Sequence, residues 1–243
     1  MLPLETEKVW NFLKEQPALA GFVLVGGSAL ALTLRHRMSE DLDFAHPSNR
    51  LPRPQLDALC REAREAGLDL QRNDDEAALE QFVHDGMELH NYQQDFLANG
   101  VVKVSFFSPD AGLQKIISGH DGPRVRIASL AELFKAKCLV SAVRSKTRDW
   151  LDLYLLMRDH GFTIRDYQAA FLEAGSQAQC DIGLARLCSG VPQKDDEGFA
   201  GLLNPAPRPD EMRDFFIAQR EQLEIETAAE MKRKSNRPQL DTV

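Results

Sequence analysis

The sequence predicts an α/β (α+β) protein in which a mixed sheet core is followed by a helical domain. Two features support this prediction. Before residue 108, short apolar or alternating runs typical of strands are interspersed with helical patterns. After residue 123, the apolar residues mostly recur at helical spacing. We therefore expect a sheet domain over residues 1–123 and a helical domain over residues 124–243, with a flexible C-terminal tail from about residue 234.

The first elements are a helix, a strand, a second helix and a second strand. Apolar residues at helical spacing predict a helix over residues 5–16, and the apolar run "GFVLV" predicts a buried strand over residues 21–25. "SALALTLRH" predicts a helix with Ser28 as its N-cap, and "EDLDFA" predicts the second strand. After a loop, Pro54 at the start and Gly67 at the end are typical boundaries of a further helix.

Short strands should complete the sheet, at "LDLQR", "LEQFVHDG", "MELHNYQ" and "GVVKVSFF". The last of these alternates, with Val104 and Phe106 on one face and Lys103 and Ser105 on the other. The helical half should contain helices over residues 129–144, 147–161, 164–175 and 210–234. Ser129 and Glu132 have capping-box spacing, and Thr147 is the expected cap of the next helix.

The composition is that of a globular protein with an excess of acids. Of its 243 residues, 43% are hydrophobic and 27% are charged, and the formal net charge is −8. This charge argues against a broad basic surface for nucleic acid, because such a surface must neutralise phosphates. Residues 124–159 depart from the average, with eight lysines and arginines against four acids, and this segment could guide a phosphate backbone.

Several classes of protein are not indicated. The N-terminus carries acids where a signal peptide has basic residues, and no apolar run approaches the roughly 18 residues of a membrane span, so we expect a cytoplasmic protein without membrane contact. The four cysteines form no CxxC pair and the six histidines form no HExxH or HxH pattern. Neither a zinc site nor a disulfide framework is therefore expected.

The stretch "FVLVGGSALALTLRHRMSEDLDFA" combines two features of a phosphate site. If the strand ends at Val25 and the helix begins at Ser28, Gly26 and Gly27 allow a tight turn, and the first N–H groups of the helix attract an anion such as a triphosphate. Arg35, Arg37 and Ser39 lie just upstream of the two aspartates in "SEDLDF" and could contact phosphates.

Asp41 and Asp43 are the candidate metal ligands. Residues i and i+2 share one face of a strand, so the two carboxylates should point into one volume and repel each other unless a cation lies between them. Magnesium is the natural cation, because it commonly shares its oxygen ligands between one or two carboxylates and substrate phosphates. A Gly-Gly pair or an Asp-x-Asp alone is usually structural. Their order here, strand, GGS, helix and SxDxD, is far more specific.

Lys137, Asp149 and Asp152 are candidates from the helical half. Asp149 and Asp152 are three residues apart and so lie on one side of a helix. They could equally be solvated acids or partners of Lys146 and Arg148, and Lys137 could be an ordinary surface lysine.

Two blocks resemble the AbiEii/AbiGii toxin family, a branch of the nucleotidyltransferase superfamily. The first is "LVGGSALALTLRHRMSEDLDF", and the second, residues 130–156, has a helical lysine, an arginine seven residues later, an Arg-Asp pair and a further Asp. The resemblance implies a nucleotidyltransferase-like sheet core and a helical partner domain, with a nucleoside triphosphate bound between them. Members act as toxins of toxin–antitoxin or abortive-infection systems, and some transfer nucleotides to the 3′ end of tRNA.

The resemblance also implies roles for particular residues. Carried over to this sequence, it assigns phosphate binding to Gly26, Gly27 and Ser28, Mg²⁺ to Asp41 and Asp43, triphosphate contact to Lys137 and completion of the site to Asp149. One feature departs from the superfamily. Many members have a third carboxylate on a later strand, whereas "GVVKVSFF" shows Lys103 and Ser105. The third acid is missing, shifted, or replaced by Asp149 or Asp152.

Three functions are compatible with these patterns. The leading hypothesis is a magnesium-dependent nucleotidyltransferase that moves a nucleoside monophosphate to an acceptor hydroxyl, on RNA such as the tRNA 3′ end, as a toxin with a cognate antitoxin. The second is a transferase acting on a small cationic molecule such as an aminoglycoside, which the negative net charge favours. The third is a non-catalytic nucleotide-binding module that acts through a protein partner, which the missing acid favours.

Overall fold

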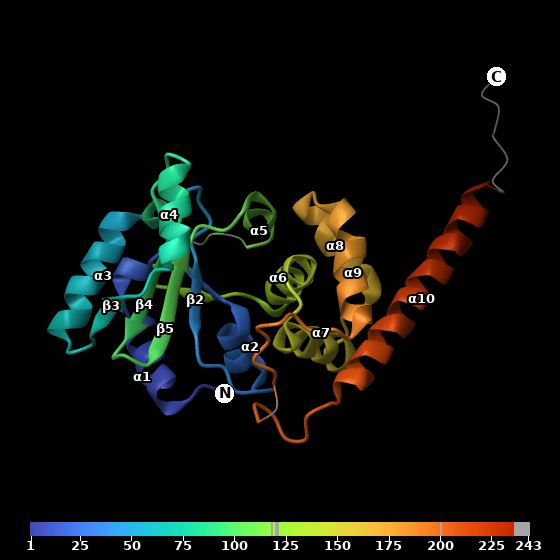
Figure 1. Ribbon diagram of the computed structural model, residues 1–243, viewed down its shortest axis with the longest axis horizontal. Helices are drawn as coiled ribbons and strands as arrows, with labels where there is room; N and C mark the ends of the chain where they lie inside the picture. The colour runs from blue at the N-terminus through green and yellow to red at the C-terminus, as the bar shows by residue number, and fades with distance from the viewer. Residues whose placement is uncertain (118, 120–121, 200, 236–243) are drawn as a thin grey trace.

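The computed structural model describes residues 1–117, 119, 122–199 and 201–235. A sheet with its covering helices forms one end of the molecule, a group of helices forms the other, and α10 runs along the outer edge of that group (Figure 1). The expected α/β architecture with a mixed sheet is confirmed. None of the described helices is both long and apolar enough to cross a membrane.

The sheet has six strands in the order β3-β4-β5-β2-β1-β6. The strands are β1 (Val23–Val25), β2 (Leu42–Ala45), β3 (Leu70–Arg72), β4 (Gln93–Ala98), β5 (Val102–Phe107) and β6 (Arg126–Ile127). Strand β2 lies between β1, to which it is antiparallel, and β5, to which it is parallel. The sheet is therefore mixed at β2, which carries Asp43 and begins directly after Asp41.

The two faces of the sheet differ in polarity. On one face Phe44 stacks on Phe106 with ring centroids 5.1 Å apart, and Trp10 of α1 (Leu4–Leu13) packs against Phe44. On the other face Asp43 pairs with Ser105, which pairs with Asp95, so these three side chains form a polar row across neighbouring strands. The period of two thus buries the aromatic residues on one side and presents the acids on the other.

Helices occupy both ends of the chain. Besides α1, the first half contains α2 (Gly26–Leu34), α3 (Arg53–Glu65), α4 (Glu76–His84) and α5 (Ala111–Ile116). The second half contains α6 (Leu130–Val143), α7 (Thr147–Asp159), α8 (Ile164–Ala174), α9 (Cys180–Ser189) and α10 (Pro209–Ser235).

Helix α6 connects the two halves. It packs against α7, α8 and α9, and also against α2 and α5 of the first half. The expected capping box is present: the Ser129 side chain accepts from the Glu132 N–H, and the Glu132 carboxylate accepts from the Ser129 N–H. A helix fixed at its start and packed against five others holds Lys137 at the boundary between the halves.

Several predicted elements were wrong. The segment "LEQFVHDG" lies mostly in helix α4 and not in a strand, because Asp75 caps that helix by accepting from the N–H groups of Ala77 and Ala78. "MELHNYQ" contains a short 3-10 turn (Leu89–Asn91), and strand β4 begins only at its last residue and continues over residues 94–98, where no strand was predicted. Helices α5 and α9 were also not predicted.

Two predicted caps were wrong as well. Helix α2 begins at Gly26, two residues before the expected start, and Ser28 instead donates its hydroxyl to the Asp41 carbonyl. Thr147 is the first residue of α7, and its N–H and hydroxyl both donate to the Asp196 carboxylate, 3.0 and 2.7 Å away. In both cases a tertiary partner takes the hydroxyl that the local pattern had assigned to a cap.

The domain division at residue 123 stays a prediction. Strand β6 lies just after it in the sequence and still pairs with β1. The expected flexible tail begins near the end of α10, and residues 236–243 lie outside the described residues.

Gly183 should be essential for close packing of α9. A Cβ at this position would overlap the Tyr167 hydroxyl of α8 and come within 2.7 Å of the Ser141 hydroxyl of α6. We expect Gly183→Ala to lower the free energy of unfolding by about 1–3 kcal/mol, because overpacking outweighs the better helix propensity of alanine. Urea unfolding measures this, with the exposed neighbour Ile182→Ala as control. Equal midpoints for Gly183→Ala and the unaltered protein would show that the helices can move apart at no cost.

Candidate active site

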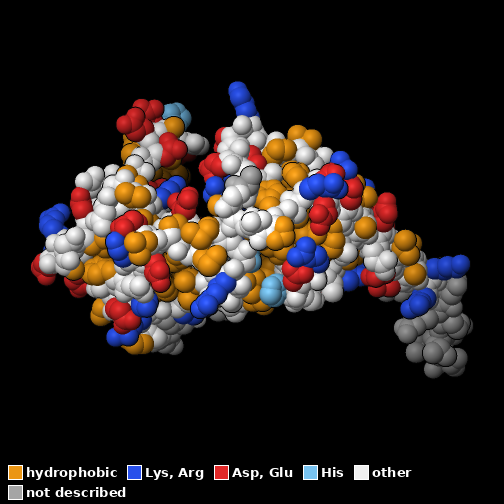
Figure 2. Space-filling view, turned by 90° about the horizontal axis from the view of Figure 1, so that it is seen from below, with side chains coloured by type: hydrophobic (Ala, Val, Ile, Leu, Met, Phe, Trp, Pro, Cys, Tyr) orange, Lys and Arg blue, Asp and Glu red, His pale blue; other side chains and the backbone are white. Residues whose placement is uncertain are grey.

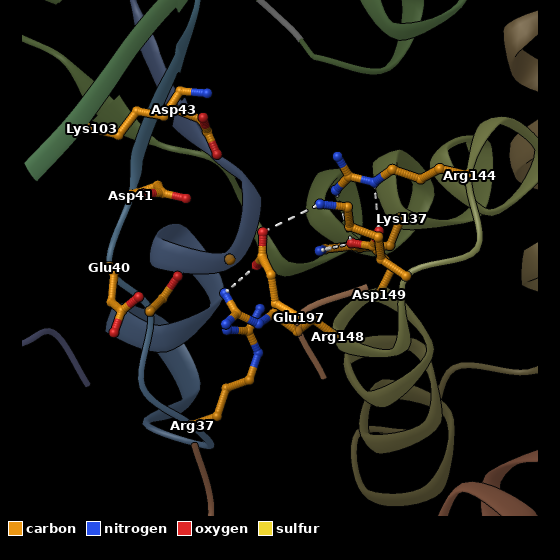
Figure 3. Close-up of a pocket in the computed structure, with 13 residues that line it drawn as sticks. Arg37, Glu40, Asp41, Asp43, Lys103, Lys137, Arg144, Arg148, Asp149 and Glu197 are labelled. Carbon is orange, nitrogen blue, oxygen red and sulfur yellow. Dashed lines mark hydrogen bonds and ion pairs between the residues drawn. The ribbon is translucent and has the colours of Figure 1, made fainter. Parts of the chain in front are cut away.

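A cavity of about 620 Å³ lies where the polar face of the sheet meets α6 and α7. Its side chains are almost all charged. The acids are Glu40, Asp41, Asp43, Asp149 and Glu197, and the cations are Arg37, Lys103, Lys137, Arg144, Lys146 and Arg148. Figure 3 shows Asp41, Asp43 and Lys103 on the sheet side and Lys137, Arg144 and Asp149 across from them. Residues from segments over 150 positions apart in sequence therefore meet in one charged hollow.

The glycine pair brings helix α2 against the acids. Gly26 has φ +72°, and a Cβ there would lie 2.7 Å from Oδ2 of Asp43. A Cβ on Gly27 would lie 2.7 Å from Nη2 of Arg37 and 2.8 Å from Oγ of Ser39. Side chains at either position would push these groups away. The start of α2, with its partial positive charge, is thus held beside Asp43, as an anion site requires.

Asp41 and Asp43 form an uncompensated acidic pair. Burial, followed by the charge of Asp41, raises the pKa of Asp43 to about 6. Burial also raises the pKa of Asp41, against the opposing effect of Lys103. Among the described residues, no side chain forms an ion pair or hydrogen bond with either carboxylate. A divalent cation would supply the missing charge, so the pair fits the magnesium that the sequence suggested.

Among the described residues, no third carboxylate joins this pair. Within the described part of the chain, no group of three or more His, Cys, Asp or Glu residues is placed to hold a metal. A cation bound to Asp41 and Asp43 would therefore complete its coordination with water and substrate oxygens, as magnesium commonly does.

The other two candidate acids belong to a buried ion-pair network. Asp152 accepts from Nε and Nη2 of Arg37 at 2.7 and 2.9 Å, and its Oδ2 lies 2.7 Å from Nζ of Lys137. The same Nζ donates to Asp149 at 2.6 Å, and Arg144 donates to Asp149 from the other side at 2.7 Å. Asp149 and Asp152 are 2% and 1% exposed. The network runs continuously from Arg37, before β2, to Arg144 at the end of α6.

The charges in this network stabilise one another. Burial alone would raise the pKa of Asp152, but Lys137 and Arg37 outweigh it and hold that pKa well below its usual range. Burial would lower the pKa of Lys137, but Asp149 and Asp152 outweigh it and raise that pKa. All these groups therefore stay ionised. Lys137 faces the cavity with its charge shared between two carboxylates, and Arg37 is engaged by Asp152.

Sequence reasoning missed Glu197 as a cavity residue. Its carboxylate lies 3.3 Å from Nη1 of Arg148 and 3.6 Å from Nζ of Lys146. The adjacent Asp196 bonds to Thr147, which fixes this part of the 190–208 loop at the start of α7. Nothing local marks Glu197, because acids in a long Pro/Gly-rich loop are ordinarily solvated.

The basic segment 124–159 does not form one surface. Ion pairs join Arg124 to Glu15, Arg126 to Glu132, Lys135 to Glu173, and Arg158 to Asp159. Of the eight basic residues in this segment, all of which the structure describes, four line the cavity: Lys137, Arg144, Lys146 and Arg148. Arg35, the alternative phosphate contact, lines a different hollow beside α1. Figure 2, which shows one side of the molecule, likewise has basic and acidic side chains intermixed.

Comparison with known proteins identifies the family of this chain. Residues 11–241 match the family model described as nucleotidyl transferase AbiEii toxin, type IV toxin–antitoxin system. The chain belongs to the AbiEii nucleotidyl transferase toxin family. The resemblance to the AbiEii/AbiGii branch is thus confirmed, and with it the classification as a nucleotidyltransferase.

Relatives of this AbiEii-family protein support the same fold. MenT4, a nucleotidyltransferase toxin from Mycobacterium tuberculosis H37Rv, superposes with a TM-score of 0.56 at 14% identity, over 87% of this chain and 82% of that one. JHP933 from Helicobacter pylori superposes with a TM-score of 0.51 at 18% identity, over 95% and 97%. An uncharacterized protein of Aquifex aeolicus (strain VF5) is 25% identical over 60% of this chain, and the match spans 63% of that protein's length.

The ionised carboxylate of Asp43 should lower the free energy of unfolding of the metal-free protein. Its pKa of about 6 exceeds the ordinary 3.8, so between these values the folded state keeps a proton that the unfolded state has lost. This group therefore lowers the stability of the metal-free protein as pH rises from about 4 to about 6. We expect Asp43→Asn to unfold at a temperature equal to or higher than the unaltered protein at pH 7 in EDTA, with a gap that narrows toward pH 4. A clearly less stable variant would contradict this account.

The carboxylate of Asp152, in contrast, should raise the free energy of unfolding. Its neutralisation leaves Arg37 and Lys137 buried with too little negative charge, so we expect Asp152→Asn to lose about 3–5 kcal/mol of unfolding free energy. Because its folded-state pKa is depressed, this contribution is present at neutral pH and is lost as pH falls through that pKa. The control is Asp159→Asn on the same helix, an exposed acid paired with Arg158, which should change stability by less than about 1 kcal/mol. If urea unfolding showed the same change in unfolding free energy for Asp152→Asn and Asp159→Asn, the buried network would not be stabilising.

Proposed function

We propose that this protein is a magnesium-dependent nucleotidyltransferase that transfers a nucleoside monophosphate from a nucleoside triphosphate to a hydroxyl of RNA, such as the 3′ end of tRNA. It would act in the cytoplasm as a toxin that a cognate antitoxin counteracts. One observation carries the proposal: the unpaired carboxylates of Asp41 and Asp43 face cations of α6 and α7 across a single cavity, with the start of α2 beside them.

The binding of the triphosphate follows from the charges around this cavity. The N–H groups at the start of α2, from Gly26 to Ser28, favour an anion. Lys137 and Arg144 add positive charge from the opposite wall, and Ser39 offers a hydroxyl next to Gly27. Phosphates at this point would lie against Asp41 and Asp43, whose repulsion a bound magnesium relieves. The acids alone would repel a triphosphate, so metal and nucleotide should bind together.

The reaction is an in-line displacement at the α-phosphorus. An acceptor hydroxyl forms the new P–O bond, the bond from the α-phosphorus to the bridging oxygen breaks, and pyrophosphate leaves while the hydroxyl proton passes to solvent. Magnesium, when bound, would neutralise the charge that develops on the α-phosphate. Lys137 would stabilise the departing pyrophosphate as a fixed positive charge, and its two carboxylate partners keep it ionised and in place.

The charges that line the cavity also indicate which kind of acceptor it can bind. Six cations and five acids line it, so its local balance is not that of the chain as a whole, whose net charge is −8. A polyanionic acceptor can therefore approach the cavity, although the negative net charge of the whole chain disfavours its binding. A small cationic acceptor is the alternative that the same assay tests.

The reaction is tested by incubating the protein with Mg²⁺, each α-labelled ribonucleoside triphosphate and total cellular RNA. We expect label to move onto an RNA band, EDTA to abolish this, and Asp43→Asn to reduce the rate by roughly a factor of 100 or more. The loss should occur in a variant that is no less stable, which separates chemistry from folding. Addition of Mg²⁺ with triphosphate should raise the unfolding temperature of the unaltered protein only.

Each other outcome identifies a different function. Label on an aminoglycoside and on no RNA would replace RNA by a small-molecule acceptor. Triphosphate binding without transfer to any acceptor would indicate a non-catalytic module. Equal transfer by Asp43→Asn would overturn the assignment of the site.

A further inference from the structure

The cations of the cavity are not equally available to a ligand. Five of the six have acidic partners. Arg37 pairs with Asp152, Lys137 with Asp149 and Asp152, Arg144 with Asp149, and Lys146 and Arg148 with Glu197. Within the described part of the chain, the side chain of the sixth cation, Lys103, forms no ion pair or hydrogen bond. An incoming anion can therefore bind Lys103 without displacing a carboxylate.

Lys103 lies beside the acids on the side away from α2. Strands β2 and β5 pair with Leu42 opposite Val104, so the preceding residues, Asp41 and Lys103, are neighbours. In the sheet β2 lies between β1, which leads into α2, and β5. Asp41 and Asp43 thus separate the start of α2 from Lys103, which Figure 3 shows on the sheet side of the cavity, opposite Lys137 and Arg144.

This arrangement determines whether Lys103 contacts the triphosphate or the acceptor. If the β- and γ-phosphates lie against α2, Lys137 and Arg144, pyrophosphate leaves on that side. An in-line displacement then requires the acceptor to approach the α-phosphorus from the opposite side, past Asp41 and along β5. Lys103 is exposed there, on the same face of β5 as Ser105.

We propose that Lys103 is the acceptor-side residue of this site and binds a backbone phosphate of the nucleic-acid acceptor next to the reacting hydroxyl. The proposal rests on the proposed nucleotidyl transfer. It divides the cavity in two: the start of α2 with Lys137 and Arg144 binds the triphosphate, and Lys103 binds the strand that receives the nucleotide. A lysine suits the second role, because a compact, flexible point charge accepts many backbone conformations.

A different role for Lys103 would be to offset the charge of Asp41 and Asp43. It lowers the pKa of both carboxylates, so some effect on metal binding is expected whatever else it does. The two roles differ in their ligand. Charge compensation would change the affinity for Mg²⁺, whereas acceptor binding would change the affinity for RNA with no metal present.

The test compares Lys103→Met with Lys8→Met, a control with the same change in charge at an exposed residue of α1. Binding of a short fluorescent single-stranded RNA with a free 3′ hydroxyl is followed by anisotropy in EDTA at several salt concentrations. We expect Lys103→Met to weaken binding by about tenfold and to reduce the slope of log affinity against log salt by about 0.7. Lys103→Arg should restore both, and Lys8→Met should change neither.

Two further measurements separate the substrates. In calorimetry with Mg²⁺, the affinity of Lys103→Met for the triphosphate should stay within about twofold of the unaltered protein. In the transfer assay, the KM for RNA should rise by about tenfold and the KM for the triphosphate should not change.

Other results would overturn the inference. Unchanged RNA binding by Lys103→Met, or a change confined to Mg²⁺ affinity, would leave Lys103 as a charge-compensating residue. A loss of triphosphate affinity would place Lys103 with the leaving group. If the unaltered protein transferred no label, the proposed function would fail, and the two binding measurements would still decide whether Lys103 contacts RNA.

Discussion

Asp152 is a fully buried carboxylate that binds Arg37 through two nitrogens and Lys137 through one, and the geometry of the cavity depends on these bonds. Arg37 follows α2 and precedes β2, Lys137 is on α6, and Asp152 is on α7. One charged side chain therefore fixes the sheet half against two helices of the other half. Buried ion pairs contribute little net stability once desolvation is counted, but they strongly disfavour arrangements in which one partner is lost.

The same network determines how charge is distributed across the cavity. Arg37, Lys137 and Arg144 carry three positive charges against two on Asp149 and Asp152, so a net positive charge faces the Asp41 and Asp43 pair. Among the described residues the acidic pair has no such partners, and a bound cation would relieve the repulsion between its two carboxylates. The four acids thus have two opposite environments: neighbouring cations lower the pKa values of Asp149 and Asp152, whereas burial raises those of Asp41 and Asp43.

The charge of the whole molecule is a poor guide to its ligands. The net charge is −8, yet cations slightly outnumber acids in the cavity. The basic segment 124–159 is spread by helix geometry and ion pairs over several surfaces. What concentrates positive charge at the site is the convergence of α6, the start of α7 and strand β5, and Glu197 from the 190–208 loop offsets part of it.

Features that depend on neighbours in the chain could be predicted from local sequence patterns. Two glycines after an apolar strand, and two acids with period two on the next strand, specify a helix start beside a pair of carboxylates. The capping box of α6 is equally local. Each of these follows from backbone geometry over a few residues, so the pattern was sufficient to place Gly26, Gly27, Asp41 and Asp43 together.

Features that depend on distant partners were set by the packing of the whole fold. Asp152 could be a solvated acid until Arg37, 115 residues away, was seen to bind it. Thr147 and Ser28 had plausible local roles that partners elsewhere replaced, and Lys103 gained its place beside Asp41 from strand pairing. Side-chain pairing across a fold depends on which elements pack together. That is set by the burial of apolar surface over the whole chain, which no short segment encodes.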